Sequence, residues 1–470
     1  MSETSATLVD QIWDRHVVRS FDDGLDLLYI SRHVLHEMSS FAAFQALERS
    51  HRAVRRPELT MAVEDHMIAT EVGRNERTYP AGEEYVVAQR RNVQLSRIRA
   101  FPMGTTNQGI AHVVSTELAF ALPGVTLVCA DSHTCTVGGV GALGIGVGSS
   151  DSGLVLATQT LLVRRPKNML VEIEGQAQSG VTAKDVILHT IATLGTGAGT
   201  GHAVEFAGSY VRSLEMEGRL TLCNMSVELG ARMGLVAPDD ITFRYLEGRR
   251  YAPRGKHWEQ ALEDWRSLAS PPGADFARRF RVDVSEVAPQ VTWGTSPQDS
   301  MGVDGHVPGE GAFEDAARRE AAARALEYMG LRPGQSLIGV PVQRVFIGSC
   351  TNSRLSDLRA AAAVARHGKV ARGVRAMVVP GSAVVKEAAE REGLDQVFRE
   401  AGFEWHEAGC SMCAGINADM LSPRERCAAT SNRNFPGRQG PLGRTHLMSP
   451  PMAAAAALAG AIVDVRTFAN

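Results

Sequence analysis

The sequence predicts an α/β protein whose sheets are mainly parallel. Two patterns indicate this fold class: short apolar runs alternate with amphipathic stretches through the first third of the chain, and residues 344–379 read as strand, helix and strand in succession. The 470 residues exceed the roughly 250–300 that a single hydrophobic core reaches, so we expect several domains. A content of 44% apolar and 21% charged residues excludes a disordered or fibrous protein.

The first predicted domain is an α/β domain that spans residues 1–165. We expect strands at residues 27–30, 59–63 and 125–129 and a helix at residues 84–98. A helix-like run follows and ends near Leu162, and the charged, proline-containing segment 164–167 then interrupts the pattern. This change of pattern places the first domain boundary at residue 165.

Two further α/β domains are predicted, at residues 166–285 and 286–470. The second begins with a strand at residues 169–173 and a helix at residues 182–194. The segment 271–309 is rich in Pro, Gly, Ser and Asp and predicts a loop around one short strand at residues 290–293. For the third domain we expect a helix within residues 308–330 that ends at Gly330, strands at 344–347 and 374–379, and helices at 355–366 and 384–392.

Charge and hydropathy narrow the classes of function. The 49 basic and 52 acidic side chains give a formal net charge of −3, which argues against a dedicated nucleic-acid-binding protein. No apolar run reaches the roughly 20 residues that a membrane helix needs. The Ala-rich stretch 452–465 is interrupted by Gly460 and Asp464 and predicts a buried helix. The first residues include acids and lack a basic segment, so we expect no secretory signal and a cytoplasmic protein.

The seven cysteines, an odd number, do not indicate a disulfide framework in a chain of this length. Cys410 and Cys413 form a C-x-x-C motif, and Cys350 lies in the loop after the predicted strand 344–347. Three cysteines in two loops can hold three corners of an iron–sulfur cube and leave the fourth iron open. The spacing by itself also allows a zinc site, a redox pair or buried structural cysteines.

Carboxylates and imidazoles are near neighbours at two predicted strand ends. Asp65 and His66 follow one strand, and the segment 131–133 follows another. Three more histidines lie near apolar segments: His33, His36 and His112. Parallel α/β proteins build sites at the carboxyl ends of strands, and a carboxylate can orient an imidazole that moves protons near neutral pH. One such pair is more often a helix cap or a loop contact, but two pairs together with these histidines make a catalytic centre an equal alternative.

A glycine-rich stretch, residues 138–148, contains the pattern G-x-G-x-x-G. It begins nine residues after the strand 125–129 ends, with a polar loop between. No acidic residue ends a second strand about 20 residues further on, so we discount a dinucleotide site. We expect instead that these glycines allow tight helix–sheet packing or form an anion-binding nest.

Two more residue pairs are candidates for ligand contacts. Asn224 and Glu228 lie four positions apart, so on a helix they would share one face, and their neighbours are apolar. Arg433 and Arg438 lie in a loop that contains Gly and Pro, where two arginines can bind carboxylates bidentately. Without further context the two arginines would be interpreted as surface residues.

The order of these motifs resembles that of the aconitase superfamily, and the chain is most similar to the isopropylmalate dehydratase large subunits within it. The resemblance extends over almost the whole chain. It rests on VLHE at 34–37, EDH at 64–66, QGIAH at 108–112, ADSHT at 130–134, LATQT at 156–160, GTGHAVEF at 199–206, MEGRLTLCNM at 216–225, GSCTNSRLSDLR at 348–359, GCSMC at 409–413 and RCAATSNRNFPGRQG at 426–440. The number and order of these motifs make a chance match negligible.

The resemblance implies a [4Fe-4S] cluster held by Cys350, Cys410 and Cys413, with one iron that lacks a protein ligand and acts as a Lewis acid. It also implies that Asp65 and His66 protonate the leaving hydroxyl of a hydroxy diacid. The remaining implied roles are acid–base and carboxylate positioning for Asp131, Ser132 and His133, hydrogen bonding for His112, proximity to the iron for Asn224 and Glu228, carboxylate binding for Arg433 and Arg438, and a substrate contact for His36. The implied reaction isomerises 2-isopropylmalate and 3-isopropylmalate in leucine biosynthesis, by trans-elimination of water and its re-addition on the adjacent carbon.

The resemblance further implies an aconitase-like fold of three α/β domains packed around the cluster. Single-chain members of the superfamily carry a mobile fourth domain with a catalytic serine base, whereas this sequence ends at Asn470, after the third predicted domain. We therefore expect an obligate small subunit that supplies the mobile domain and the serine. We also expect a hydroxy-diacid substrate and neither a nucleic-acid nor a membrane partner.

Six places depart from the residues usual in the isopropylmalate group. They are Ser31, Ala130, residues 135–137, residues 151–154, residues 406–408 and residues 414–416. The implied catalytic residues are intact, so the departures bear on substrate choice, and a paralogous enzyme for citramalate, dimethylmalate, benzylmalate or a phosphinyl analogue stays open. Two further alternatives are an iron-sensing RNA-binding protein, which the net charge and the length disfavour, and a zinc-stabilised scaffold, which metal analysis would identify.

Overall fold

The computed structural model describes residues 6–468, so residues 1–5 and 469–470 of the predicted first and third domains lie outside the described range. The chain forms two compact units. Unit 1 comprises residues 1–67, 82–175 and 197–283, and unit 2 comprises residues 68–81, 176–196 and 284–470. The chain passes between the units several times, and the division into three domains at residues 165 and 285 stays a prediction.

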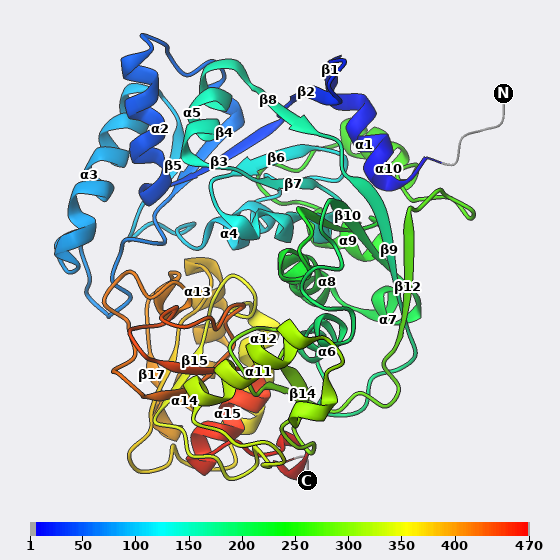
Figure 1. Ribbon diagram of the computed structural model, residues 1–470. Coiled ribbons are helices and arrows are strands. Elements are labelled where there is room, and N and C mark those ends of the chain that lie inside the picture. Colours follow the sequence, from blue (N-terminus) through cyan, green and yellow to red (C-terminus); the bar gives the residue numbers. More distant parts are fainter. Residues whose placement is uncertain (1–5, 469–470) are drawn as a thin grey trace. The chain divides into compact units, whose positions relative to one another are not determined.

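Unit 1 alternates strands and helices through most of its length (Figure 1). Its elements are α1 Leu8–His16, β1 Val17–Ser20, β2 Leu25–Tyr29, β3 Arg32–His36, α2 Glu37–Arg49, η1 Pro57–Leu59, β4 Thr60–Val63, most of α3 Pro80–Leu95, β5 Arg99–Phe101, α4 Ala111–Glu117, β6 Thr126–Cys129, η2 Ser132–Val140, β7 Leu143–Gly146, α5 Ser149–Thr158, β8 Thr160–Arg164, β9 Lys167–Glu174, β10 His202–Ala207, α7 Ser209–Ser213, α8 Met216–Asn224, η3 Met225–Leu229, β11 Met233–Val236, α9 Asp240–Leu246, α10 Lys256–Arg266 and β12 Arg278–Asp283. The elements η1 to η3 are 3-10 helices.

The central sheet of unit 1 is parallel, with the strand order β5-β4-β3-β6-β7. Strands β4 and β6 are buried at every position, as expected for a parallel sheet covered on both faces. The register pairs His36 with Val63 and Val34 with Cys129. The segments that follow β3, β4 and β6 therefore leave the sheet at the same edge.

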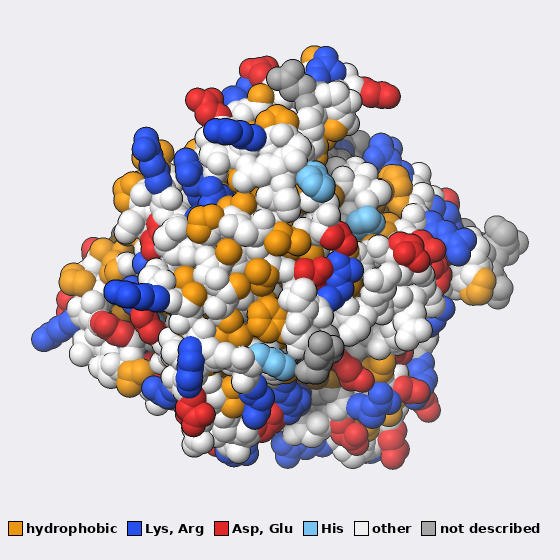
Figure 2. Space-filling model, turned by 90° about the horizontal axis from the view of Figure 1, so that it is seen from below, with side chains coloured by type: hydrophobic (Ala, Val, Ile, Leu, Met, Phe, Trp, Pro, Cys, Tyr) orange, Lys and Arg blue, Asp and Glu red, His pale blue; other side chains and the backbone are white. Residues whose placement is uncertain are grey.

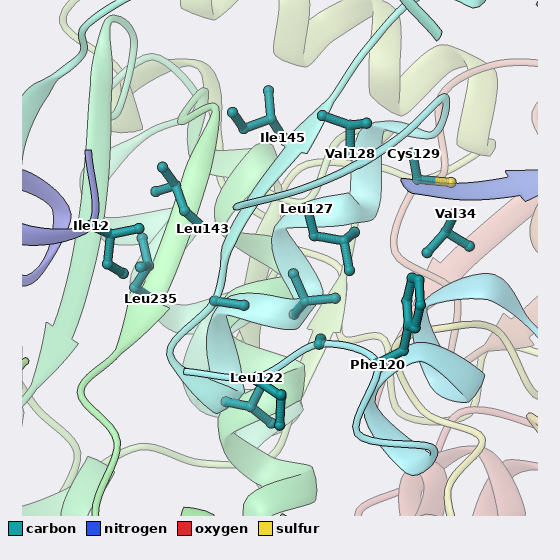
Figure 3. Close-up of a cluster of buried hydrophobic side chains, with 14 of the residues drawn as sticks. Ile12, Val34, Phe120, Leu122, Leu127, Val128, Cys129, Leu143, Ile145 and Leu235 are labelled. Atoms are coloured by element: carbon teal, nitrogen blue, oxygen red, sulfur yellow. The ribbon is translucent and has the colours of Figure 1, made fainter. Parts of the chain in front are cut away.

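One apolar core joins the sheets of unit 1. Besides the central sheet, this unit holds a parallel sheet with the order β11-β10-β9-β12 and a small antiparallel sheet, β1-β2-β8. Figure 3 shows Leu127 and Leu143 of the central sheet in a cluster with Ile12 of α1 and Leu235 of β11, and all four side chains are buried. Burial of such side chains stabilises each by about 1.5–3 kcal/mol, so this cluster holds the strand ends in place.

Unit 2 is built on a second parallel sheet. Its elements are α6 Ala183–Leu194, β13 Gln290–Thr292, β14 Ser300–Gly302, η4 Glu310–Ala312, α11 Ala316–Met329, β15 Arg344–Ile347, α12 Leu355–Ala365, β16 Arg375–Val378, α13 Ala383–Arg391, α14 Leu394–Ala401, β17 Glu404–Trp405, η5 Ser411–Cys413, β18 Arg426–Ala429, β19 Arg444–Leu447, α15 Pro450–Ala459 and η6 Val465–Phe468. The strand order is β17-β16-β15-β18-β19. Helices α12 and α15 pack together, and their alanines allow a close approach.

Most predicted elements are confirmed, including the strand 344–347 at its predicted bounds and the left-handed Gly330 that ends α11. Three expectations were wrong. The run that ends near Leu162 is not helical: α5 ends at Thr158, and β8 follows with alternating burial. The loop 271–309 contains two additional strands, β12 and β14. The charged residues of β12 suit an edge position, because only Val282 is buried. Helix α15 ends at Ala459, since Gly460 adopts a left-handed cap.

The surface charge agrees with the balanced composition. Figure 2 shows acidic and basic side chains interspersed over the face in view, with no broad area of one sign. Among residues 6–468, no helix is both long enough and apolar enough to cross a membrane.

Candidate active site

The polar residues predicted after β3, β4 and β6 meet at one edge of the central sheet of unit 1. The histidine that ends β3 is His36, the pair Asp65 and His66 follows β4, and residues 131–133 follow β6. The strands are parallel neighbours, so their carboxyl ends bring these side chains together. The expected catalytic centre of unit 1 is therefore a single cluster of side chains.

Asp65 and His66 form a fully buried carboxylate–imidazole pair. Their Oδ1 and Nδ1 atoms lie 2.6 Å apart, and the second oxygen of Asp65 accepts the backbone N–H of Ala111, the first residue of α4, at 2.9 Å. Burial alone would raise the pKa of Asp65, but the charge and hydrogen bond of His66 outweigh it and hold that pKa below its usual value. The ionised Asp65 thus fixes the orientation of the His66 ring.

Asp131 lies within reach of three imidazoles. Its carboxylate oxygens lie 3.2 Å from Nε2 of His66 and 3.2 Å from Nε2 of His112, and it accepts the backbone N–H of His133 at 2.7 Å. Burial opposes ionisation of Asp131, but His112, followed by the other two histidines, lowers its pKa well below the usual range. Nε2 of His133 in turn lies 3.1 Å from Glu228. Carboxylates and imidazoles therefore alternate across the cluster, an arrangement suited to proton transfer.

His36 and Glu37 hold the Asp65–His66 turn from the start of α2. The His36 ring stacks on the His66 ring with centroids 4.2 Å apart, and burial lowers the pKa of His36 to about 4, so its ring is neutral. The Glu37 carboxylate accepts the backbone N–H groups of Asp65, His66 and Met67. No role was predicted for Glu37, although a carboxylate directly after a buried strand and at a helix start was a usable signal.

One predicted relationship, that of Asn224 and Glu228, was wrong. They do not share the face of one α-helix, because α8 ends at Asn224 and Glu228 lies in the 3-10 helix η3. Asn224 instead donates to Thr136 at 2.8 Å, while Glu228 contacts His133. Ser132 is exposed, with its hydroxyl 3.4 Å from Nδ1 of His133. All three predicted residues nevertheless lie beside the same acid–base cluster.

The glycine-rich stretch places η2 directly against other backbone. A Cβ on Gly138 would lie 1.7 Å from the carbonyl oxygen of Gly234 in β11, and a Cβ on Gly144 would lie 2.3 Å from that of Thr134. The expectation of tight packing is confirmed. Because η2 begins at Ser132, these contacts also hold the turn that carries Asp131 and His133.

Cys350, Cys410 and Cys413 lie in two loops of unit 2, and one asparagine contacts both loops. Cys350, Cys410 and Cys413 are each 5% exposed and form no disulfide. The Asn432 side chain lies 3.5 Å from Sγ of Cys350 and 3.7 Å from Sγ of Cys413. Asn432 therefore brings the Cys350 loop and the C-x-x-C turn to one place, a contact that the sequence analysis did not foresee.

The three sulfurs are spaced too widely to bind one zinc ion together. Two sulfurs bound to one zinc ion lie at most about 4.6 Å apart. The three Sγ atoms do not all lie within 4.8 Å of one another; among the described residues only His36, Asp65 and His66 offer three ligand atoms so close together. A cube, in which each cysteine binds a different iron, spaces its ligands further apart and fits the donor set.

The loop after Asn432 carries the two predicted arginines. Asn434 fixes this loop by donating to Thr292, Gly294 and Thr445. Arg433 and Arg438 are half-buried, and Nε of Arg438 is buried without a hydrogen-bond partner among the described residues. A buried guanidinium nitrogen with no partner in the protein is suited to receive a ligand carboxylate.

A network of hydrogen bonds centred on Asp419 holds the C-x-x-C turn. Asp419 accepts hydrogen bonds from Ser411, inside the turn, at 2.8 Å and from Thr70 at 2.7 Å. Thr70 also lies 3.1 Å from Nδ1 of His406, one of the residues that depart from the isopropylmalate group. Sequence reasoning missed Asp419, because its partners are distant in the chain.

The comparisons with known proteins agree with the motifs. A model of the aconitase family (aconitate hydratase) matches residues 10–460. The chain is 54% identical over 462 residues to "3-isopropylmalate dehydratase large subunit 1" of Bradyrhizobium diazoefficiens, covering 98% of this chain and 97% of that protein. A solved structure of aconitase X in its holo-form, from Thermococcus kodakaraensis, aligns over 91% of this chain and 89% of that chain with a TM-score of 0.46 and 12% identity. The resemblance read from the motifs is confirmed, and the chain belongs to the aconitase family of hydro-lyases.

Proposed function

We propose that this chain is the large subunit of a [4Fe-4S] hydro-lyase that interconverts 2-isopropylmalate and 3-isopropylmalate in cytoplasmic leucine biosynthesis. The observation that carries the substrate assignment is the 54% identity, over nearly the whole length, to a relative that bears that name. The reaction needs an acid–base group and a Lewis acid, and the chain has residues for both: the alternating carboxylates and imidazoles of unit 1 and the three thiols of unit 2.

Cys350, Cys410 and Cys413 would hold the cluster. When bound, the cluster supplies a Lewis-acidic iron without a protein ligand, which polarises the leaving hydroxyl. Three thiols suit this function because they provide three ligands for four irons, and Asn432 contacts two of them, Cys350 and Cys413. Nearly complete burial of the sulfurs limits the access of water to the site.

His66 is the proposed acid that protonates the leaving hydroxyl. Asp65 binds its Nδ1 and leaves Nε2, 3.2 Å from Asp131, as the nitrogen that exchanges protons. The ionised Asp65 and Asp131 both stabilise the imidazolium form of the His66 ring. His112, His133 and Glu228 extend the network that restores the proton.

The remaining site residues are proposed to bind the substrate. Arg433 and Arg438 take its carboxylates, for which the partnerless Nε of Arg438 is the structural argument. His36, Ser132 and Asn224 orient the diacid beside the acid–base cluster. The proton on the substrate carbon needs a further base, and we propose that a small subunit supplies a serine for it on a mobile domain. The words "large subunit" in the name of the relative support that partner.

A second substrate needs a test because two of the departures contact site residues. The carbonyl oxygen of Ala130 accepts from Nε2 of His36 at 3.2 Å, and Sγ of Cys135 lies 3.4 Å from the carbonyl oxygen of Asn224. Ser31 lies 2.9 Å from Nε2 of His16, just before β3. The alternative substrates are citramalate, dimethylmalate, benzylmalate or a phosphinyl analogue.

Cysteine replacement and a substrate panel test the proposal together. Anaerobically reconstituted protein should contain iron and sulfide, which C413A loses and C427A retains, because Cys427 is buried in β18 without a predicted ligand role. With the small subunit added, 3-isopropylmalate should give the highest kcat/KM of the panel. Absence of iron and sulfide from the wild type would overturn the cluster, and a higher kcat/KM for another malate would overturn the substrate.

Oxygen exposure tests the open iron. An iron without a protein ligand is lost on oxidation, so aerobic purification should give weak activity and the signal of a three-iron cluster in electron paramagnetic resonance. Iron and a reductant should restore both the four-iron form and the activity. Activity that responds to neither treatment would contradict an iron that lacks a protein ligand.

A further inference from the structure

Lys184 is a fully buried cation in unit 2 that the predicted site does not use. It is the second residue of α6, its exposed fraction is 0%, and its Nζ donates to the carbonyl oxygens of Thr430 at 3.0 Å and Ser431 at 2.6 Å. Among residues 6–468, no carboxylate oxygen lies within 4.0 Å of this nitrogen. Burial of an ammonium group without a paired anion costs several kcal/mol, so a negative charge nearby is required.

Charges on two of the predicted cluster cysteines stabilise the buried ammonium group of Lys184. Burial lowers the pKa of Lys184 to about 8, and the charges that act against this shift are, in order, those of Cys413, Asp357, Asp185 and Cys350. Burial raises the pKa of Asp185, and its carboxylate already accepts the backbone N–H groups of Thr182 and Gln290. Asp357 is engaged by Asn352 and by the backbone of Arg354. The two thiols, once ionised as cluster ligands, are the natural counter-charge.

The contacts of Lys184 also place it directly before the site loop. The two carbonyls that it binds follow β18 and precede Asn432 and Arg433. The Thr430 hydroxyl donates to the carbonyl oxygen of Gly348 at 2.8 Å, two residues before Cys350. Lys184 therefore joins α6 to the backbone that positions Asn432 between Cys350 and Cys413.

We propose that Lys184 is a positioning and charge-balancing residue for the iron–sulfur cluster. Its buried ammonium group offsets the negative charge of the thiolate ligands, and its hydrogen bonds fix the backbone that carries Asn432. This inference rests on the proposed function, since it requires the cluster. It assigns Lys184 no contact with the substrate. A positive charge at this place stabilises the reduced state of the cluster relative to the oxidised state.

Three variants separate the charge of Lys184 from its hydrogen bonds to the two carbonyls. K184M removes both, and K184Q keeps an amide donor without the charge. K369M is the matched control, because Lys369 is exposed and also donates to a backbone carbonyl, that of Glu400. Each is reconstituted anaerobically, and iron content, sulfide content, reduction potential and thermal stability with and without the cluster are measured. None of these measurements depends on turnover.

We expect K184M to retain iron roughly 10–100-fold less tightly than the wild type, the range typical for residues that support metal ligands. Its reduction potential should shift downward, and K184Q should share that shift while recovering part of the iron retention. Without the cluster, K184M should be at least as stable as the wild type, because it lacks an uncompensated buried charge. K369M should match the wild type throughout.

A K184M protein with the iron retention and reduction potential of K369M would overturn the inference. If K184M does not fold, K184Q carries the same comparison, and an unchanged potential in K184Q would overturn the charge-balancing role. A wild type that takes up no iron and sulfide would instead refute the proposed function, so the two failures are distinguishable.

Discussion

The carboxylate of Glu37 accepts the backbone N–H of His66 at 2.6 Å. The same carboxylate accepts the N–H groups of Asp65 and Met67, so one side chain at the start of α2 holds three consecutive residues after β4. These donors lie 28 to 30 residues after Glu37 in the chain, so the local sequence around α2 does not predict the contact. The position of the His66 ring therefore depends on Glu37 as well as on Asp65.

Replacement of Glu37 should reduce stability and disturb proton transfer together. In E37Q an amide NH₂ would face a backbone N–H, which leaves a buried donor unpaired at a cost of about 1–3 kcal/mol. Urea unfolding should show this loss, and the pH profile of kcat/KM should shift because the His66 ring is less well oriented. E48Q, an exposed replacement on the same helix, is the control. Equal stabilities for E37Q and E48Q would show that the hydrogen bonds of Glu37 to residues 65–67 do not stabilise the fold.

Removal of the Asp65 charge should slow catalysis strongly and leave the metal content unchanged. D65N cannot stabilise the imidazolium of His66, so kcat should fall by roughly 10²–10⁴-fold, the usual contribution of a positioned acid or base. Iron and sulfide content should stay at the wild-type level, because Asp65 belongs to unit 1 and the three cysteines to unit 2. D240N, an exposed replacement in unit 1, should have no effect. A D65N enzyme with normal turnover would refute the assigned role.

Glu205 should make the stability of the protein depend on pH. It lies in β10, accepts a hydrogen bond from Ser270 at 2.6 Å, and burial raises its pKa to about 7 from the usual 4.5. Between these values the folded protein keeps a proton that the unfolded chain releases. Stability from this group is therefore present below pH 4.5 and falls as the pH rises to 7, by at most roughly 3 kcal/mol.

The variant E205Q isolates this effect, because glutamine keeps a neutral hydrogen-bonding group without the titration. Urea unfolding at pH 5, 6, 7 and 8 should show that E205Q gains stability relative to the wild type as the pH rises. Parallel curves for the two proteins would mean that Glu205 does not hold its proton in the folded state.

A methyl group at Gly138 should loosen η2. The nearest backbone oxygen would lie 1.7 Å from the new Cβ, so η2 or β11 must move, and we expect a loss of about 3 kcal/mol or more in the free energy of unfolding. Activity should fall as well, because η2 carries His133. In G197A, where nothing lies within 4 Å, stability should change by less than about 1 kcal/mol. Similar thermal unfolding of both variants would contradict the close packing.

Local pattern was sufficient for most elements of this fold. Residues 345–347 are apolar and are followed by a glycine, and the strand 344–347 is buried at every position. These properties of the sequence depend on neighbouring residues alone. The pattern was insufficient at residues 160–164, where apolar residues suit a helix or a strand and pairing with β2 decided for the strand. It was also insufficient at Glu228, because the helix changes to 3-10 geometry after Asn224.

The sequence by itself determined the candidates for the chemistry, namely the Asp–His pairs at strand ends and the three cysteines, and the order of motifs that marks the aconitase family. Only the tertiary structure decided which of them touch. The reach of Asp131 to both His66 and His112 follows from strand order, and the contact of Lys184 with Ser431 joins residues 247 positions apart. Such contacts depend on how elements that are distant in the sequence pack together. The local periodicity of the sequence does not contain that information.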